Sequence, residues 1–255
     1  PRYCIPSSAV TSISSNRVRS GHSPRGGATY LSGVRAVSAG GNHACAITSN
    51  QRVRCWGRNY DGQGGIGTSG HDTDIPYAST DASYMAFRPL RIQALTNVVD
   101  LAPGLNHTCV VALSNGVGRV WCWGKGTAGQ LGHGQTPDLS SRPVILPSVG
   151  GGGYIEVVSG AERSCARTAS GQVYCWGSDT NGAVGNGGAQ SGIYNTPQQV
   201  QGLPLPAVSI TSGAFHNCAM LTDGSVYCWG SGGEGQMGNN SRQNSASAVP
   251  VNDPF

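Results

Sequence analysis

Eight of the nine cysteines form four pairs that recur along the chain. The second cysteine of each pair lies in a Val-x-Cys-Trp-Gly string, as in Val226-Tyr227-Cys228-Trp229-Gly230, and the first precedes a short polar segment. Such paired thiols can form a disulfide, can bind a metal ion, or can stay reduced in a core. The pairs are Cys45 and Cys55, Cys109 and Cys122, Cys165 and Cys175, and Cys218 and Cys228.

The segment between the cysteines favours the disulfide. It carries turn residues such as Ser114-Asn115-Gly116 and Thr222-Asp223-Gly224, which predict a tight β-hairpin. Directly opposed residues of antiparallel strands have Cα atoms about 4.5 to 5.5 Å apart, within the range that a disulfide accepts. We therefore predict one disulfide per hairpin and an oxidising compartment, so that the protein is secreted or on the cell surface. Cys4 is left over, either as a free thiol or as a bridge to another chain.

Metal binding is the competing chemistry, because His43, His107 and His216 each lie two residues before a paired cysteine. A zinc site needs four such ligands, but the third repeat has Arg163 at this position, and there is no Cys-x-x-Cys motif. We expect no metal and no cofactor, and we expect each histidine to hold a blade's turn by hydrogen bonds.

Catalytic motifs are not found either. The string Gly-x-Gly-x-x-Gly begins at Gly62, Gly124 and Gly230, but without the strand, helix and distal acid of a dinucleotide site. We expect these glycines to shape loops. The acidic residues are dispersed, so we predict no catalytic residues and no enzymatic activity.

Four strands position each cysteine pair. A β-branched run precedes the first cysteine, the hairpin follows, and a proline-marked segment such as Arg142-Pro143-Val144 closes the repeat as an edge strand. Four strands in a repeat of roughly 50 residues are typical of a β-propeller blade. Trp56, Trp123, Trp176 and Trp229 recur with the repeat and are expected in the core between blades, whereas Trp121 lies outside the pattern and is expected to be exposed.

The order Gly, His-x-Cys-Ala, Asp-Gly, Val-x-Cys-Trp-Gly, Gly-Gln-x-Gly and Pro-x-Val resembles the repeat of the regulator-of-chromosome-condensation family. It is most similar to an extracellular or bacterial-style variant with a cysteine pair in each blade, and the resemblance covers residues 34–251. It implies an all-β propeller of four-stranded antiparallel sheets whose loops bind protein partners. The chain divides into a partial blade at 1–33 and four blades at 34–97, 98–153, 154–206 and 207–255, which either close into a ring or belong to a longer propeller.

Composition disfavours nucleic acid and a membrane span. The 16 basic and 12 acidic residues give a net charge of +4, and the arginines are scattered, which disfavours nucleic acid. No apolar run approaches the roughly 20 residues of a membrane span. The sequence begins at Pro1, so we expect a processed chain or part of a longer one.

Surface contacts are predicted in the longest loop, where exposed aromatic residues could anchor a partner. These residues are Tyr77, Tyr84, Met85 and Phe87. Asn239 and Asn106 begin glycosylation sequons, and Asn239 is the better candidate because it lies in a glycine-rich loop.

The function predicted from these features is a non-enzymatic extracellular protein-interaction or structural module. It would belong to a larger chain or surface assembly and bind protein partners or copies of itself. The alternative is a lectin-like or inhibitor-like propeller that binds a glycan or another ligand. Guanine-nucleotide exchange or chromatin binding, which the family name suggests, ranks lower because nuclear and cytosolic cysteines stay reduced.

Overall fold

The structure is a computed structural model that describes residues 30–67, 85–135, 139–150 and 152–252, except for four strand side chains. These four are Met85, Phe87, Arg88 and Leu139.

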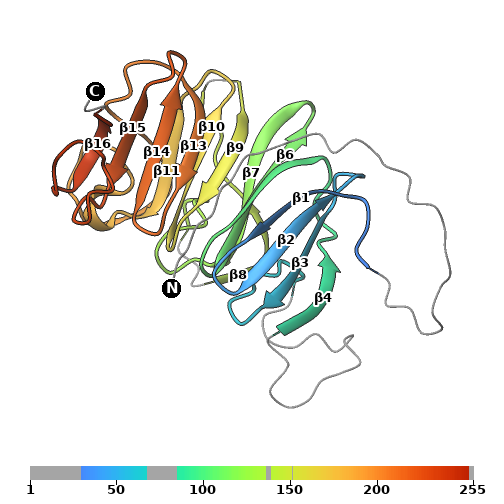
Figure 1. Cartoon of the computed structure of the whole chain (residues 1–255). Helices are drawn as coiled ribbons and strands as arrows, with labels where there is room; N and C mark the ends of the chain where they lie inside the picture. Colours follow the sequence, from blue (N-terminus) through green and yellow to red (C-terminus); the bar gives the residue numbers. More distant parts are fainter. Residues whose placement is uncertain (1–29, 68–84, 136–138, 151, 253–255) are drawn as a thin grey trace, which may run out of the picture.

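Sixteen strands form four separate four-stranded antiparallel sheets, each in sequence order, which confirms the predicted all-β propeller architecture (Figure 1). Sheet 1 contains β1 (Val34–Ala39), β2 (His43–Thr48), β3 (Val53–Arg58) and β4 (Met85–Arg91). Sheet 2 contains β5 (Val98–Pro103), β6 (His107–Ser114), β7 (Val117–Lys125) and β8 (Leu139–Ile145). Sheet 3 contains β9 (Tyr154–Ser159), β10 (Arg163–Thr168), β11 (Val173–Ser178) and β12 (Ile193–Gln199), with a short 3-10 turn, η1 (Thr180–Gly182), after β11. Sheet 4 contains β13 (Ala207–Ser212), β14 (His216–Leu221), β15 (Val226–Gly230) and β16 (Ser245–Pro250).

The second and third strands of each sheet form the predicted hairpin. In sheet 2 the turn residues Asn115 and Gly116 have φ angles of 51° and 77°, the positive values that a tight two-residue turn requires. This turn sets the register, in which Cys109 pairs with Cys122. The fourth strand carries the predicted proline and is the edge strand of each sheet, where a missing N–H costs no ladder hydrogen bond.

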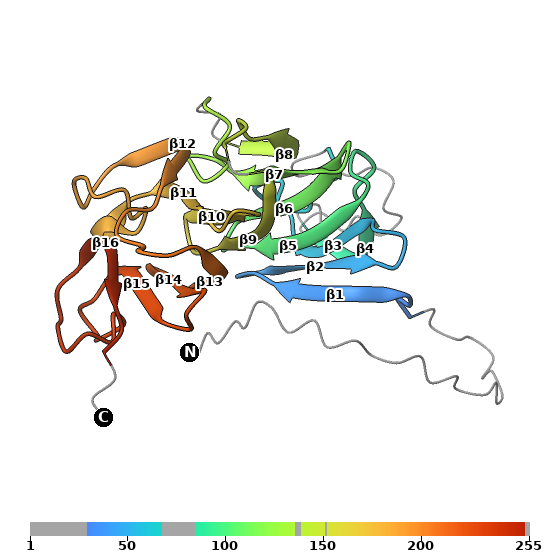
Figure 2. The ribbon, with the colours of Figure 1, turned by 90° about the horizontal axis from the view of Figure 1, so that it is seen from above.

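The sheets stand side by side as blades along an open arc (Figure 2). The first strands β1, β5, β9 and β13 lie on the inner side of the arc, where neighbouring ones contact one another. An apolar cluster fills each of the three gaps between neighbouring sheets. Each cluster combines the disulfide of one sheet with the tryptophan of the next, so that the repeat motif builds the interfaces between sheets.

The burial of the repeated tryptophans follows from this arrangement. Trp123, Trp176 and Trp229 are fully buried between sheets, as predicted. Trp56 was expected there too but is only half-buried, because no described sheet precedes sheet 1. Trp121, expected to be exposed, is partly buried against the cluster between sheets 1 and 2.

Candidate functional site

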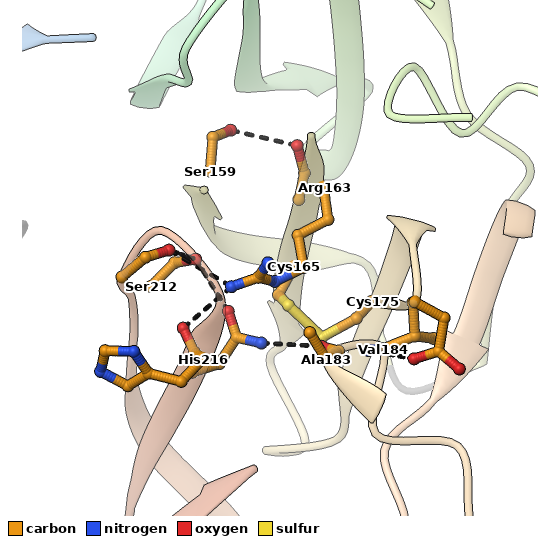
Figure 3. The surroundings of a disulfide bond; sticks show 12 residues. Ser159, Arg163, Cys165, Cys175, Ala183, Val184, Ser212 and His216 are labelled. Carbon is orange, nitrogen blue, oxygen red and sulfur yellow. Dashed lines mark hydrogen bonds between the residues drawn. A yellow bond between two sulfur atoms is a disulfide. The ribbon is translucent and has the colours of Figure 1, made fainter. Parts of the chain in front are cut away.

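Four disulfides link the central strands of the sheets, and their pairing is the predicted one. The paired cysteines lie directly opposite each other with Cα atoms 4.0 to 4.1 Å apart. Figure 3 shows the bridge of sheet 3, between Cys165 and Cys175, beside residues of sheet 4. The six cysteines of sheets 1, 2 and 3 are buried and belong to the apolar clusters. In sheet 4, Cys228 is buried, Cys218 is half-buried, and neither belongs to a cluster.

The repeated histidine joins one sheet to the next. His43 Nε2 lies 2.7 Å from the hydroxyl of Thr108, and His107 Nε2 lies 2.8 Å from the hydroxyl of Ser164. The histidine does not hold a blade's turn, as was predicted, because its partner is the hydroxyl of a strand residue in the next sheet. Burial lowers the pKa of His43 to about 4 and that of His107 to about 3, so both imidazoles are neutral at neutral pH.

Arg163 replaces this histidine in sheet 3 and makes the same kind of link with different atoms. Its guanidinium donates to the backbone carbonyls of Ala214 at 3.0 Å, His216 at 3.1 Å and Gly213 at 3.3 Å, all where β13 turns into β14 of sheet 4 (Figure 3). Burial lowers the pKa of Arg163 to about 10, so the group stays charged.

Two inner-strand carboxylates, which the sequence analysis treated as dispersed, also connect neighbouring sheets. Asp100 Oδ2 accepts the backbone N–H of Val157 at 2.8 Å, and Glu156 Oε1 accepts that of Ile210 at 3.3 Å. Glu156 also pairs with Arg167 at 2.7 Å. Burial raises the pKa of Asp100 to about 6. The signal in the sequence was their equivalent position in the first strand of consecutive repeats.

Among the residues that the structure describes, no three His, Cys, Asp or Glu side chains come together as a group that could hold a metal ion. The same part of the chain contains no helix able to cross a membrane.

One end of the arc exposes residues whose equivalents are buried elsewhere. On the side of sheet 4 that faces away from sheet 3, Met220 is 44% exposed, whereas the equivalent Ile47 of sheet 1 is 3% exposed. Val226 and Val251 are likewise exposed. His216, which occupies the linking-histidine position, is half-buried. We call this surface, made of His216, Met220, Val226 and Val251, the trailing face.

The other end of the arc lies on sheet 1. Val37 is 66% exposed there, whereas its counterparts Leu101, Val157 and Ile210 are buried against the preceding sheet. We call this surface, which includes Val37, Arg54 and Trp56, the leading face.

The structure describes no side chain for five of the other predicted site residues. Cys4, Tyr77 and Tyr84 lie outside the described residues, and for Met85 and Phe87 only the backbone, in β4, is described. Their predicted roles as an unpaired or intermolecular cysteine and as partner contacts stay predictions.

The two sequons differ in their surroundings. Asn239 is half-buried, and its Oδ1 accepts the backbone N–H of Ser241 at 3.2 Å. Asn106 Oδ1 is buried with no hydrogen-bond partner among the described residues, and Thr108 of its sequon is fully buried. Glycosylation of either residue stays a prediction.

The chain is similar in sequence to two longer proteins with different names. Human E3 ubiquitin-protein ligase HERC2 is 33% identical over 79% of the chain, and the Arabidopsis thaliana ultraviolet-B receptor UVR8 is 32% identical over 80%. The chain spans only 4% and 43% of these two relatives, respectively.

Solved structures show the same fold. Yeast RCC1 (Prp20), solved with Kap60, superposes with a TM-score of 0.73 at 17% identity, over 89% of this chain and 50% of that one. Human WBSCR16 superposes with a TM-score of 0.72 at 20% identity, over 87% of this chain and 53% of that one.

Family models match most of the described chain. One model of the regulator of chromosome condensation (RCC1) repeat matches residues 34–63, 154–183 and 207–236, and a second matches 117–167, 170–220 and 223–252. The matched segments include the cysteine-bearing hairpins of sheets 1, 3 and 4 and the second strand of the sheet 2 hairpin. The chain therefore belongs to the regulator of chromosome condensation (RCC1) repeat family.

Proposed function

We propose that this chain is a non-enzymatic protein-interaction or structural module that works in an extracellular, oxidising compartment as part of a larger chain or surface assembly. The observation that carries the proposal is the trailing face. The equivalents of Val226 and Val251 are buried in all three internal interfaces, and the equivalents of Met220 are buried in two of them. Apolar patches that remain exposed mark interaction sites.

Burial of this face would be favourable. Removing apolar surface from water contributes about 25 cal/mol per Å², and Met220, Val226 and Val251 are each more than a third exposed. A partner that covered them would reproduce contacts that the chain already makes between its own sheets.

The four disulfides support the compartment. Disulfides form and persist in secreted and cell-surface proteins and are rare in the cytosol and nucleus, where thiols are kept reduced. The relatives are named as a ubiquitin ligase and a light receptor, so the repeat occurs in proteins of several functions. A ligase activity is not transferred to this chain, which spans a small part of the ligase.

Protein binding is supported by the solved relatives. Yeast RCC1 was solved bound to Kap60, and a second structure of this yeast protein was described together with its binding to Gsp1p and histones. At under 25% identity, these structures show that the fold can bind proteins, and they do not identify the partner of this chain.

Site-specific photo-crosslinking tests the proposal. A photoreactive p-benzoylphenylalanine replaces Met220 on the trailing face, or Val117, which is similarly exposed at the hairpin of sheet 2 and serves as the control. In cells that make the protein, we expect a defined protein adduct from position 220 and none from position 117. No adduct at 220, or the same adducts at both positions, would contradict an interface on this face.

A further inference from the structure

The leading face of sheet 1 differs from the corresponding faces of the other three sheets. In those sheets an aromatic residue precedes the second cysteine and packs against the cluster shared with the preceding sheet; these residues are Trp121, Tyr174 and Tyr227. Sheet 1 has Arg54 at this position. A guanidinium thus replaces the aromatic side chain that the other interfaces use.

A second difference concerns the residue between the histidine position and the first cysteine. Thr108 and Ser164 bond to the histidine of the preceding sheet, and Asn217 donates to the carbonyl of Ala183 in the preceding sheet at 2.8 Å. Sheet 1 has Ala44, whose methyl group can make no such bond. The leading face therefore lacks two of the features by which the other sheets join the one before them.

A hollow of about 500 Å³ lies beside Arg54. Three arginines line it, and they are Arg52, Arg54 and Arg91. The rest of the lining is the hairpin turn at 48–50, Pro89 and the segment 30–33. Arg54 and Arg91 are opposite each other on β3 and β4. We call this site the arginine hollow. Its volume lies in the range of ligand-binding pockets, about 300 to 1,000 Å³.

The arginines are oriented but keep free donors. Arg54 Nη1 donates to the carbonyl of Pro89 at 3.4 Å, and Arg52 Nη1 donates to that of Leu95 at 3.3 Å. Each guanidinium has five N–H donors, so most of them are left for a ligand. Among the described residues, no Asp or Glu lines the hollow, and the two ion pairs found there involve Lys125 and Arg167 instead.

We propose that the arginine hollow binds an acidic segment of a protein partner that presents at least two carboxylates. Guanidinium groups bind carboxylates through paired N–H···O bonds, and three of them in one hollow suit closely spaced acidic side chains. Tyr30, 88% exposed at the rim, offers an aromatic surface to the apolar parts of the segment.

A nucleic acid fits the observations less well. Its affinity grows with the number of phosphates that cations neutralise along an extended track, whereas these three arginines are gathered in one hollow. The proposal rests on the proposed interaction function and names the chemistry of one partner surface.

Fluorescence anisotropy with the full chain tests the site. The probe is a labelled peptide of alternating Glu and Ala, and the comparison peptide has Gln in place of Glu. We expect the Glu peptide to bind, the Gln peptide not to, and the R54Q/R91Q double variant to bind at least about tenfold more weakly, since hydrogen bonds to charged groups contribute strongly. Raising the salt from 50 to 200 mM should weaken binding, as for any partly exposed charge pairing.

The matched control is R119Q/R242Q, which removes the same charge from β7 and from the loop before β16 and should bind as the unchanged protein does. R54K/R91K keeps the charge and should retain part of the affinity, which separates a folding defect from loss of the site. Equal losses in both Gln double variants, no binding of the Glu peptide, or tighter binding of a single-stranded DNA probe would each overturn the proposal. Because the crosslinking test reads the trailing face, the two proposals can fail separately.

Discussion

At the scale of single residues, one position of the repeat performs one task with two chemistries. His43 and His107 reach hydroxyl groups of the next sheet, whereas Arg163 reaches backbone carbonyls. The histidines must be neutral and buried for this, while the arginine stays charged because several carbonyl oxygens solvate it in place of water. This position therefore couples the contacts between sheets to pH only where it is histidine.

The first prediction concerns acid stability. The pKa of an unfolded histidine is about 6.5, and in the folded protein it is about 4 for His43 and about 3 for His107. The unfolded chain therefore takes up protons first, and stability that is complete above pH 6.5 is lost as the pH falls. Between pH 6.5 and 5 the free energy of unfolding should fall by at most about 2 kcal/mol per histidine.

Asp100 acts in the opposite direction. Its folded pKa of about 6 exceeds its ordinary value, so the folded protein gains stability as the pH falls through 6, although one carboxyl opposes two histidines. Urea unfolding at pH 7 and pH 5 measures the net loss. Asp100→Asn should steepen it, and His107→Gln should reduce it by more than half, because Asp100 still opposes the remaining histidine. A protein equally stable at both pH values, or variants with unchanged pH dependence, would rule out this mechanism.

At the scale of elements, the glycine-rich loop after the Trp-Gly strand of sheets 1, 2 and 3 receives the tryptophan of the next sheet. A Cβ atom built on Gly65, Gly132 or Gly185 would lie 2.5 to 2.6 Å from the indole of Trp123, Trp176 or Trp229, respectively. The loop carbonyls of Gln63 and Gln130 accept the indole N–H groups of Trp123 and Trp176. These glycines thus have a packing role, in addition to the shaping of loops that the sequence analysis expected of the repeated glycines.

The second prediction compares two glycines with similar backbone angles. Gly132 (φ +67°) meets Trp176 Cδ1 at 2.5 Å, whereas Gly116 (φ +77°), in the hairpin turn of sheet 2, has no atom within 4 Å. Alanine at either position costs about 1 to 2 kcal/mol for the left-handed conformation. Gly132→Ala should cost roughly 1 to 3 kcal/mol more, because the tryptophan must move. Equal unfolding free energies of the two variants in urea would show that the loop does not seat the tryptophan tightly.

At the scale of the whole molecule, four sheets form an open arc with two unlike ends. The trailing face repeats the apolar composition of the internal interfaces, whereas the leading face carries Arg54 and Ala44 in place of an aromatic and a hydrogen-bonding side chain. The chain spans about half of the solved relatives that it superposes on. The two ends are therefore expected to meet different partners.

The third prediction tests the compartment in which the whole molecule folds. Each bridge closes a short loop and stabilises the chain by at most about 3 kcal/mol, and only in an oxidising environment. Thiol titration of the protein from its natural source, denatured without reductant, should find no more than one free thiol per chain, because eight of its nine cysteines are bonded. Eight or nine free thiols would place the protein in a reducing compartment, and titration after reduction serves as the control.

Much of the fold could be predicted from the sequence because the relevant interactions are local. The strands, the hairpin turns and the pairing of Cys165 with Cys175 depend on residues close together in the chain, and a turn such as Asn115-Gly116 sets the register directly. The order of these local features was also enough to recognise the repeat. The sequence by itself therefore determined the blade, its disulfide and its family.

Only the tertiary structure decided how the blades meet. His43 and Thr108 are 65 residues apart and His107 and Ser164 are 57 apart, so neither pair can be read from spacing within a repeat. The same holds for the carboxylate of Asp100, for the half-buried state of Trp56 and for the arginine hollow beside Arg54. Whether an apolar or charged side chain is a core residue or an exposed contact depends on whether a neighbouring sheet covers it, and that is a property of the assembled arc.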